Sequence, residues 1–168
     1  MPDDTLALDR SRTFSWEDPV SLASAARAMP GIELLRGIRD GSVPPPPVMH
    51  LLDYALDEVE EGRVTCRFEP REFHYNTLGS LHGGVIATLL DTAAGCAVHS
   101  TLPAGMAYTT LDLKVTYLRA VTASSGPLRC EGRVLHAGAR VAMSEARLED
   151  AAGKLHAHAT STCLVLRP

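Results

Sequence analysis

The segment His82-Gly83-Gly84 places two glycines where a helical pattern begins. The first backbone N–H groups of a helix have no partner within it, and the helix dipole adds partial positive charge there. Because glycines carry no side chain, a ligand oxygen can come close to these N–H groups. The segment therefore predicts a site that polarises a carbonyl or holds a developing oxyanion, with a tight loop-to-helix turn as the alternative.

Asp91 lies in the middle of the apolar stretch that follows these glycines. At 100° per residue, its arc of the helix carries no other charge, whereas the opposite arc is bulky and should face a core. The residues that share the arc of Asp91 are Gly84, Ala87, Thr88, Ala94, Gly95 and Val98. A solvated helix face usually carries several charges, so we expect Asp91 to act as a base or nucleophile in a partly desolvated cleft. An ordinary surface acid is the alternative.

The spacing of these two features predicts an assembly. Gly83 and Asp91 are eight residues apart, which is about 12 Å along a helix axis. A carboxylate and an oxyanion donor that serve one carbonyl must both lie within a few ångströms of it. Two antiparallel copies of the helix across a two-fold axis would bring Gly83 of one chain beside Asp91 of the other. If both residues are catalytic, we expect at least a dimer with sites at the interface.

Other chemistries have little support in the sequence. The chain has no HExxH motif, G-x-S-x-G elbow, phosphate loop or dinucleotide fingerprint, so we expect no metal and no bound cofactor. His156 and His158 share a strand, but a lone pair is a weak metal site. The four cysteines are far apart and without a CxxC pair, and we expect buried free thiols rather than a disulfide or metal site.

The bulk properties indicate one ordinary globular domain. The 168 residues are 45% apolar and 21% charged, with a net charge of −4, so neither a nucleic acid nor an anionic membrane is an expected partner. The N-terminus lacks the pattern of a secretory signal, and no apolar run approaches the roughly 20 residues that span a bilayer. The expected location is the cytoplasm.

The order of elements predicts an α+β fold. Residues 21–41 indicate one or two short helices broken at Pro30, followed by a stiff proline connector at 44–47 and a helical turn. A hairpin over 55–70, a loop over 71–81 and a helix over 83–99 precede four more strands. These strands are expected within 108–120, 125–138, 140–151 and 154–166. We expect the helix to pack against one antiparallel sheet, in a domain over 48–168 with an N-terminal helical extension and connector over 1–47.

The segments His74–Gly95, 109–120 and 138–150 resemble the hotdog-fold acyl-CoA thioesterases of the PaaI type, which are related to the 4-hydroxybenzoyl-CoA thioesterases. The similarity covers about residues 48–167, because the loop, helix and strand order all agree. In that family an antiparallel sheet wraps one long helix, and two chains form a continuous double sheet. The resemblance implies a homodimer, with a dimer of dimers as a further expectation.

The resemblance also implies roles for individual residues. Asp91 matches the general base or nucleophile of the family, and Gly83 matches the N–H that polarises the thioester carbonyl. His82 and Asn76 match side chains that orient the thioester or the attacking water, and Thr110 falls where relatives have a hydroxyl near the water. The expected substrate-binding residues are Gly84 and Thr88 in the helix and the basic residues Arg119, Arg140 and Lys114 for the phosphates of coenzyme A.

The expected activity is hydrolysis of an acyl-CoA thioester, in which coenzyme A is part of the substrate and no other cofactor takes part. We expect an aromatic acyl group or one of short to medium length, and the sequence does not separate a water-mediated from a covalent route. A non-catalytic module that binds or senses acyl thioesters on the same fold is the alternative function. Hydration or dehydration of an acyl-CoA would need an additional acid–base pair.

Overall fold

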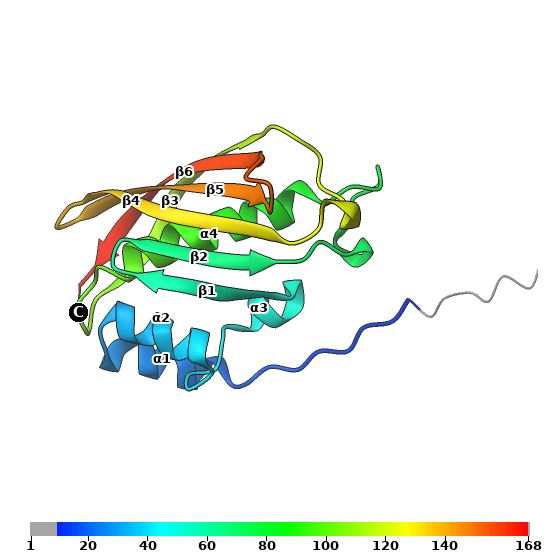
Figure 1. Cartoon of the computed structure of the whole chain (residues 1–168). Helices are drawn as coiled ribbons and strands as arrows, with labels where there is room; N and C mark the ends of the chain where they lie inside the picture. The colour runs from blue at the N-terminus through cyan, green and yellow to red at the C-terminus, as the bar shows by residue number, and fades with distance from the viewer. Residues whose placement is uncertain (1–9, 168) are drawn as a thin grey trace, which may run out of the picture.

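The computed structural model describes residues 10–167, and it confirms the predicted architecture of one long helix against an antiparallel sheet (Figure 1). The long helix is α4, Gly83–His99. The sheet contains β1 (Tyr54–Glu60), β2 (Arg63–Phe68), β3 (Ala107–Tyr117), β4 (Leu128–Ala137), β5 (Val141–Asp150) and β6 (Leu155–Leu166). Short 3₁₀ turns lie at Glu72–His74 and Ala123–Ser125. The elements follow the order that the sequence predicts.

All strand pairs of the sheet are antiparallel, and the spatial order is β1-β2-β4-β5-β6-β3. The last strand of the chain, β6, therefore lies between β5 and β3, and β3 forms one edge of the sheet. β3 pairs with β6 from Ala107↔Leu166 to Tyr117↔Ala157, with an irregularity between Thr110 and Asp112. This long edge strand carries Thr110, which contacts Asp91, and Tyr117, which contacts Gly83.

The inner face of the sheet and the bulky arc of α4 form the core. Leu89, Leu90 and Ala93 are fully buried against residues such as Val64 and Leu148. Alternating strand residues point inward, as a strand period of two requires, and this explains the burial pattern of β5. Cys66, Cys130 and Cys163 are buried and all four cysteines are free, which confirms the prediction of unpaired thiols.

The small-residue arc of α4 is less open than the sequence predicts. Its C-terminal half is covered, because Ala94, Gly95 and Val98 are buried. Tyr108 of β3 packs directly on this part, and a Cβ added at Gly95 would lie 2.4 Å from the Tyr108 hydroxyl oxygen. The cleft expected around Asp91 therefore does not extend along this half of the helix. Free space remains only in the N-terminal half, around Asp91.

The residues before β1 form three helices, of which α1 and α2 lie within the predicted N-terminal extension and α3 begins at its boundary. α1 spans Pro19–Ala28, α2 spans Gly31–Asp40 and α3 spans Pro47–Leu52, with the predicted break at Pro30. α2 lies beside β1 (Figure 1), and its Leu35 belongs to the main core. Gly31 touches the end of α4, because its N–H donates to the Leu102 carbonyl and an added Cβ would clash with the His99 carbonyl. Among residues 10–167, no helix is long and apolar enough to cross a membrane.

Candidate active site

The start of α4 is held by the loop that precedes it. His82 is the N-cap residue, and its ring Nδ1 accepts a hydrogen bond of 2.9 Å from the Gly84 N–H. The His82 N–H donates to the His74 carbonyl. His74 is itself buried, with Nδ1 accepting from the Arg71 N–H and Nε2 facing the Leu52 carbonyl. Both ring nitrogens of His74 are therefore engaged as in a neutral imidazole, and burial is the main cause of its lowered pKa.

These contacts leave one free donor at the helix start. Val85 and Ile86 donate to the His82 carbonyl and Gly84 donates to the His82 ring. In the described part of the chain, the Gly83 N–H has no hydrogen-bond partner. An unpaired N–H at a helix N-terminus is the geometry that a carbonyl oxygen or oxyanion needs. Gly83 therefore offers the free donor, whereas the Gly84 N–H, expected to contact the substrate, is bonded within the chain.

Tyr117, at the end of β3, fixes the position of Gly83. Its hydroxyl donates to the Gly83 carbonyl at 3.0 Å, and its ring lies 3.4 Å from where a Cβ of Gly83 would be. The sequence carries no local signal for this contact, because Tyr117 lies 34 residues from Gly83. The pairing of β3 with β6 brings the two together.

A first depression surrounds the Gly83 backbone. Its lining includes Asn76, Gly83, Ile86, Tyr117 and Arg119. Three of the predicted site residues thus meet at one place. The Asn76 side chain is also used locally, since its Oδ1 accepts from the Leu78 and Ser80 N–H groups and shapes the loop. Arg119 donates to the Leu155 carbonyl and keeps a largely exposed side chain beside this depression.

A second depression contains Asp91. It is lined by Ala87, Thr88, Asp91, Thr110 and Leu113, and it is shallow and open. The Thr110 hydroxyl donates to Asp91 Oδ1 at 3.0 Å. Asp91 is half-buried, and within residues 10–167 no Lys, Arg or His forms an ion pair with it. The carboxylate is thus oriented by a hydroxyl and is not neutralised by a cation.

Two neutral titratable groups lie near Asp91. These groups are Tyr108 and Cys96, and burial is the main cause of the raised pKa of both, with the charge of Asp91 as a further cause. The pKa of the Cys96 thiol is raised to about 12. The Thr88 hydroxyl donates to the Gly84 carbonyl at 2.9 Å, so this hydroxyl is hydrogen-bonded within the helix.

The remaining predicted binding residues lie farther away. Lys114 lies between Leu113 and Val115, which pack toward the core, so strand alternation points it to the outer face of the sheet. Arg140 lies in the β4–β5 turn, where its carbonyl accepts from the Val165 N–H. Val165 packs with Val98, so this turn lies at the C-terminal end of α4, opposite the end that carries Gly83 (Figure 1). Within one chain, neither residue meets Gly83 or Asp91.

The histidine pair considered for a metal is engaged in hydrogen bonds to carboxylates. His156 contacts Asp150 at 3.1 Å, and His158 contacts Glu145 at 3.3 Å. Within the part of the chain that the structure describes, no group of three or more His, Cys, Asp or Glu side chains could hold a metal ion.

The comparisons with known proteins agree on one family. Residues 78–157, which contain α4 and most of the sheet, match the thioesterase superfamily. A protein of Saccharolobus solfataricus assigned as an esterase is 32% identical over 120 residues, which are 71% of this chain and 84% of that protein. Human acyl-coenzyme A thioesterase 13 is 37% identical over 57 residues, which are 34% of this chain and 40% of that enzyme.

A solved structure shows the same fold. A Ralstonia eutropha protein assigned as a thioesterase related to phenylacetic acid degradation superposes with a TM-score of 0.70 at 29% identity. The similarity covers 77% of this chain and 98% of that one. Most of the relative is therefore matched, whereas about a quarter of this chain is not.

Proposed function

The chain belongs to the thioesterase superfamily and is a thioester hydrolase, and we propose that it hydrolyses acyl-CoA with Asp91 as the base or nucleophile and the Gly83 N–H as the carbonyl-binding donor. The observation that carries this proposal is the pairing of an unneutralised carboxylate with a free N–H on one helix. The similarity to human acyl-coenzyme A thioesterase 13 supports coenzyme A as the thiol part of the substrate.

The site is completed by a second copy of the chain. Gly83 and Asp91 occupy the same straight helix about 12 Å apart, and they line different depressions. One carbonyl cannot contact both within a single chain. An antiparallel α4 from a second chain places its Asp91 beside the first Gly83, and symmetry then gives two identical sites.

The free edge of the sheet supports this assembly. β3 ends the sheet, and Leu111 and Tyr117 on it are more than half exposed. A long edge strand with exposed apolar side chains is a surface that proteins normally cover. Pairing of two β3 strands would cover it and would bring the two α4 helices together. In the same arrangement, Arg140 at the end of one α4 approaches Arg119 at the start of the other, and both would face the phosphates of coenzyme A.

The chemistry follows from the two groups. The Gly83 N–H stabilises the negative charge that develops on the thioester oxygen as the carbonyl carbon becomes tetrahedral. Asp91 either takes a proton from a water that attacks this carbon or attacks it directly. Collapse of the tetrahedral intermediate breaks the C–S bond and releases coenzyme A. On the water route, the proton held by Asp91 passes to the leaving thiolate; on the direct route, a water then hydrolyses the mixed anhydride left on Asp91, which frees the carboxylic acid and restores the carboxylate. Thr110 holds one carboxylate oxygen of Asp91 and leaves the other available.

The proposal is tested with a panel of aromatic and straight-chain acyl-CoA thioesters and detection of the released thiol. Wild type should release thiol and Asp91→Asn should not. Equal slow release by both proteins, with binding intact, would show a binding module in place of an enzyme.

A mixing experiment tests the shared site. Asp91→Asn and Gly83→Val chains, each inactive alone, are unfolded, mixed and refolded together. Hybrid dimers regain one intact site, so about a quarter of wild-type activity per chain pair, or somewhat less, should return. No recovery, although a mass measurement shows hybrid dimers, would contradict a site shared between chains.

A further inference from the structure

An apolar chamber lies beside the start of α4, on the other side of His82 from the Gly83 depression. Its walls come from four parts of the chain: an N-terminal arm, α3, the 3₁₀ turn at 72–74 with its neighbour Tyr75, and α4 itself. Most of the lining is apolar, and it comprises Arg12, Phe14, Leu51, Leu52, Phe73, His74, Tyr75, His82 and Val85. The chamber therefore borders the predicted carbonyl site directly.

The N-terminal arm, residues 10–17, is fixed in place by specific contacts. Arg10 pairs with Glu72 at 2.5 Å. The Arg12 guanidinium donates to the His50 and Leu51 carbonyls, which belong to the last turn of α3 and lack partners within that short helix. It also lies 4.4 Å from the centre of the Phe73 ring. The arm is thus tied to both neighbouring walls of the chamber.

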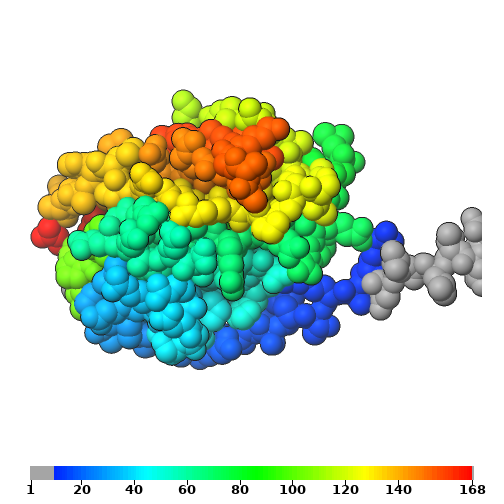
Figure 2. All heavy atoms as spheres, viewed as in Figure 1, coloured from blue at the N-terminus to red at the C-terminus, as the bar shows by residue number. Residues whose placement is uncertain are grey.

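The arm leaves apolar side chains in the chamber exposed. Phe14 is 38% exposed, Leu51 46% and Phe73 47%. These three side chains come from three different segments and gather beside one helix start. Figure 1 shows the arm running along α3 toward the end of the molecule where α4 begins, and Figure 2 shows its blue atoms reaching green atoms on that side. Exposed apolar groups in a concave place indicate an apolar ligand.

The two sides of the helix start differ in the way that the two ends of an acyl-CoA differ. The Gly83 depression contains Arg119 and Asn76 beside apolar residues such as Ile86, and these two polar side chains suit a polar and anionic group. The chamber also contains one arginine, Arg12, but its guanidinium donates to the carbonyls at the end of α3. The chamber beyond His82 is mainly apolar, and both nitrogens of its buried His74 are already bonded. A thioester whose carbonyl lies at the Gly83 N–H therefore has a polar side for coenzyme A and an apolar side for the acyl tail.

We infer that the arm and α3 build an acyl-binding chamber in which Phe14 and Leu51 set the acceptable length of the acyl tail. The inference rests on the proposed function and adds the specificity of the same site. It also gives a role to the N-terminal arm, which lies outside the residues 78–157 that match the thioesterase superfamily. The ligand is the aliphatic or aromatic part of the substrate.

The test compares kcat/KM for straight-chain acyl-CoA thioesters from two to twelve carbons. In wild type, kcat/KM should rise by up to about fourfold for each methylene that enters the chamber, and then level off. Phe14→Trp and Leu51→Trp narrow the chamber from two different walls. Each should lower kcat/KM for the longer chains by about tenfold or more while leaving acetyl-CoA within twofold of wild type. Phe14→Ala should flatten the rise with chain length.

Val20→Ala is the matched control, because Val20 is an apolar residue of the same extension that is 68% exposed on α1 and outside the chamber lining. Its chain-length profile should equal that of wild type. A purely structural role of the arm predicts the same loss for every acyl length, and that result, or unchanged profiles in both Trp variants, overturns the inference. The two Trp variants lie on separate segments, so unfolding of one leaves the other decisive.

Binding of non-hydrolysable S-alkyl-CoA thioethers separates failure of the inference from failure of the proposed function. If wild type cleaves no acyl-CoA, the proposed function fails, but the dependence of Kd on alkyl length still tests the chamber. A Kd that falls with alkyl length in wild type and no longer does so in Leu51→Trp supports the chamber. A Kd independent of alkyl length in wild type contradicts it.

Discussion

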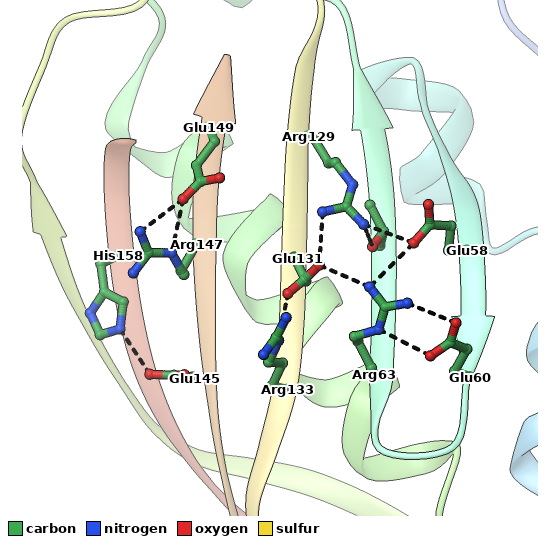
Figure 3. Close-up of polar contacts among 11 residues, drawn as sticks. Glu58, Glu60, Arg63, Arg129, Glu131, Arg133, Glu145, Arg147, Glu149 and His158 are labelled. Carbon is green, nitrogen blue, oxygen red and sulfur yellow. Dashed lines mark hydrogen bonds and ion pairs between the residues drawn. The ribbon is translucent and has the colours of Figure 1, made fainter. Parts of the chain in front are cut away.

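Two carboxylates of this protein, Glu131 on the outer face of the sheet and Asp91 on α4, are both partly buried but have opposite surroundings. Glu131 is contacted by Arg63, Arg129 and Arg133 at 2.5–3.2 Å (Figure 3). Burial would raise the pKa of Glu131, but the hydrogen bonds and charges of these arginines lower it on balance. Asp91 has one hydroxyl and no cation. The difference supports the reactive role proposed for Asp91, whereas the arginines hold Glu131 in a cluster of ion pairs.

The outer face extends this pattern beyond Glu131. Arg63 also pairs with Glu60 on the next strand, and Arg147 pairs with Glu149, so the charges alternate across β1, β2, β4 and β5 (Figure 3). Rows of ion pairs of this kind are typical of a solvated sheet face, and each pair contributes little to the free energy of unfolding. The presence of a charge is therefore less informative than the identity of its neighbours.

The largest expected effect comes from Asp91→Asn. Because the amide keeps the shape of the carboxylate but is neither a base nor a nucleophile, kcat should fall by about 100-fold to 10,000-fold. The free energy of unfolding should stay equal or rise, since an unneutralised half-buried charge is removed. Thiol release and chemical denaturation measure the two quantities on the same preparation. A variant that loses stability and activity together would place Asp91 with Glu131 as a structural carboxylate.

Thr110→Val should have the next largest effect on activity. Valine fills a similar volume but cannot donate to Asp91 Oδ1, so the carboxylate loses its orienting contact. The expected result is a kcat about tenfold lower, which corresponds to the loss of one hydrogen bond to a charged group. Thr110→Ser retains the donor and should recover most of the rate. If both variants behave like wild type, the hydroxyl does not position the base.

Glu131→Gln should lower stability and leave catalysis intact. The substitution removes the negative charge that three arginines contact, so the free energy of unfolding should fall by about 1 kcal/mol. The effect is this small because the arginines are partly exposed and solvent screens their charges. The loss should shrink at high salt as the charges are screened. Urea denaturation at two salt concentrations measures it, with acyl-CoA hydrolysis expected within twofold of wild type. A large loss of rate would contradict the separation of the two carboxylates.

The smallest expected effect concerns buried histidines and pH. Burial lowers the pKa of His99 below its ordinary value of 6.5. The unfolded chain therefore binds a proton near pH 6.5 that the folded chain binds only at lower pH, so stability falls as the pH drops through 6.5. His99→Phe should reduce this slope, because phenylalanine retains the ring contact with Tyr108 and does not titrate. Thermal unfolding between pH 5 and 8 measures the slope, and His74, whose pKa is also lowered, should account for part of the remainder.

Local patterns in the sequence predicted the elements well. The glycines and the apolar run place α4 at Gly83–His99, and turn residues separate the strands as observed. The uncharged neighbours of Asp91 within the helix also follow from the sequence alone, because helical geometry fixes which residues share an arc. Tyr117 and Tyr108 could not be found in this way. Each reaches α4 only because β3 lies beside β6, and such a pairing depends on the packing of segments far apart in the chain.

The basic residues illustrate the same limit. Arg119 and Arg140 look alike in the sequence, yet one lies at the Gly83 depression and the other beside the opposite end of α4. Lys114 follows strand alternation to the outer face. Residue type alone does not reveal at which end of the sheet a residue lies, because strand order and register determine its position.

The sequence by itself determined the position of α4, the single acid among its uncharged neighbours, and the glycines at its start that can offer backbone donors. It also indicated the fold that is built around this helix. These features depend on contacts within about ten residues. The tertiary structure decided which of those groups are free. It closed half of the small-residue arc with Tyr108, used the Gly84 N–H to bind His82, and brought an N-terminal arm beside the helix start. Long-range packing made these choices, because burial and hydrogen-bond competition depend on every neighbour in space and not only on those in sequence.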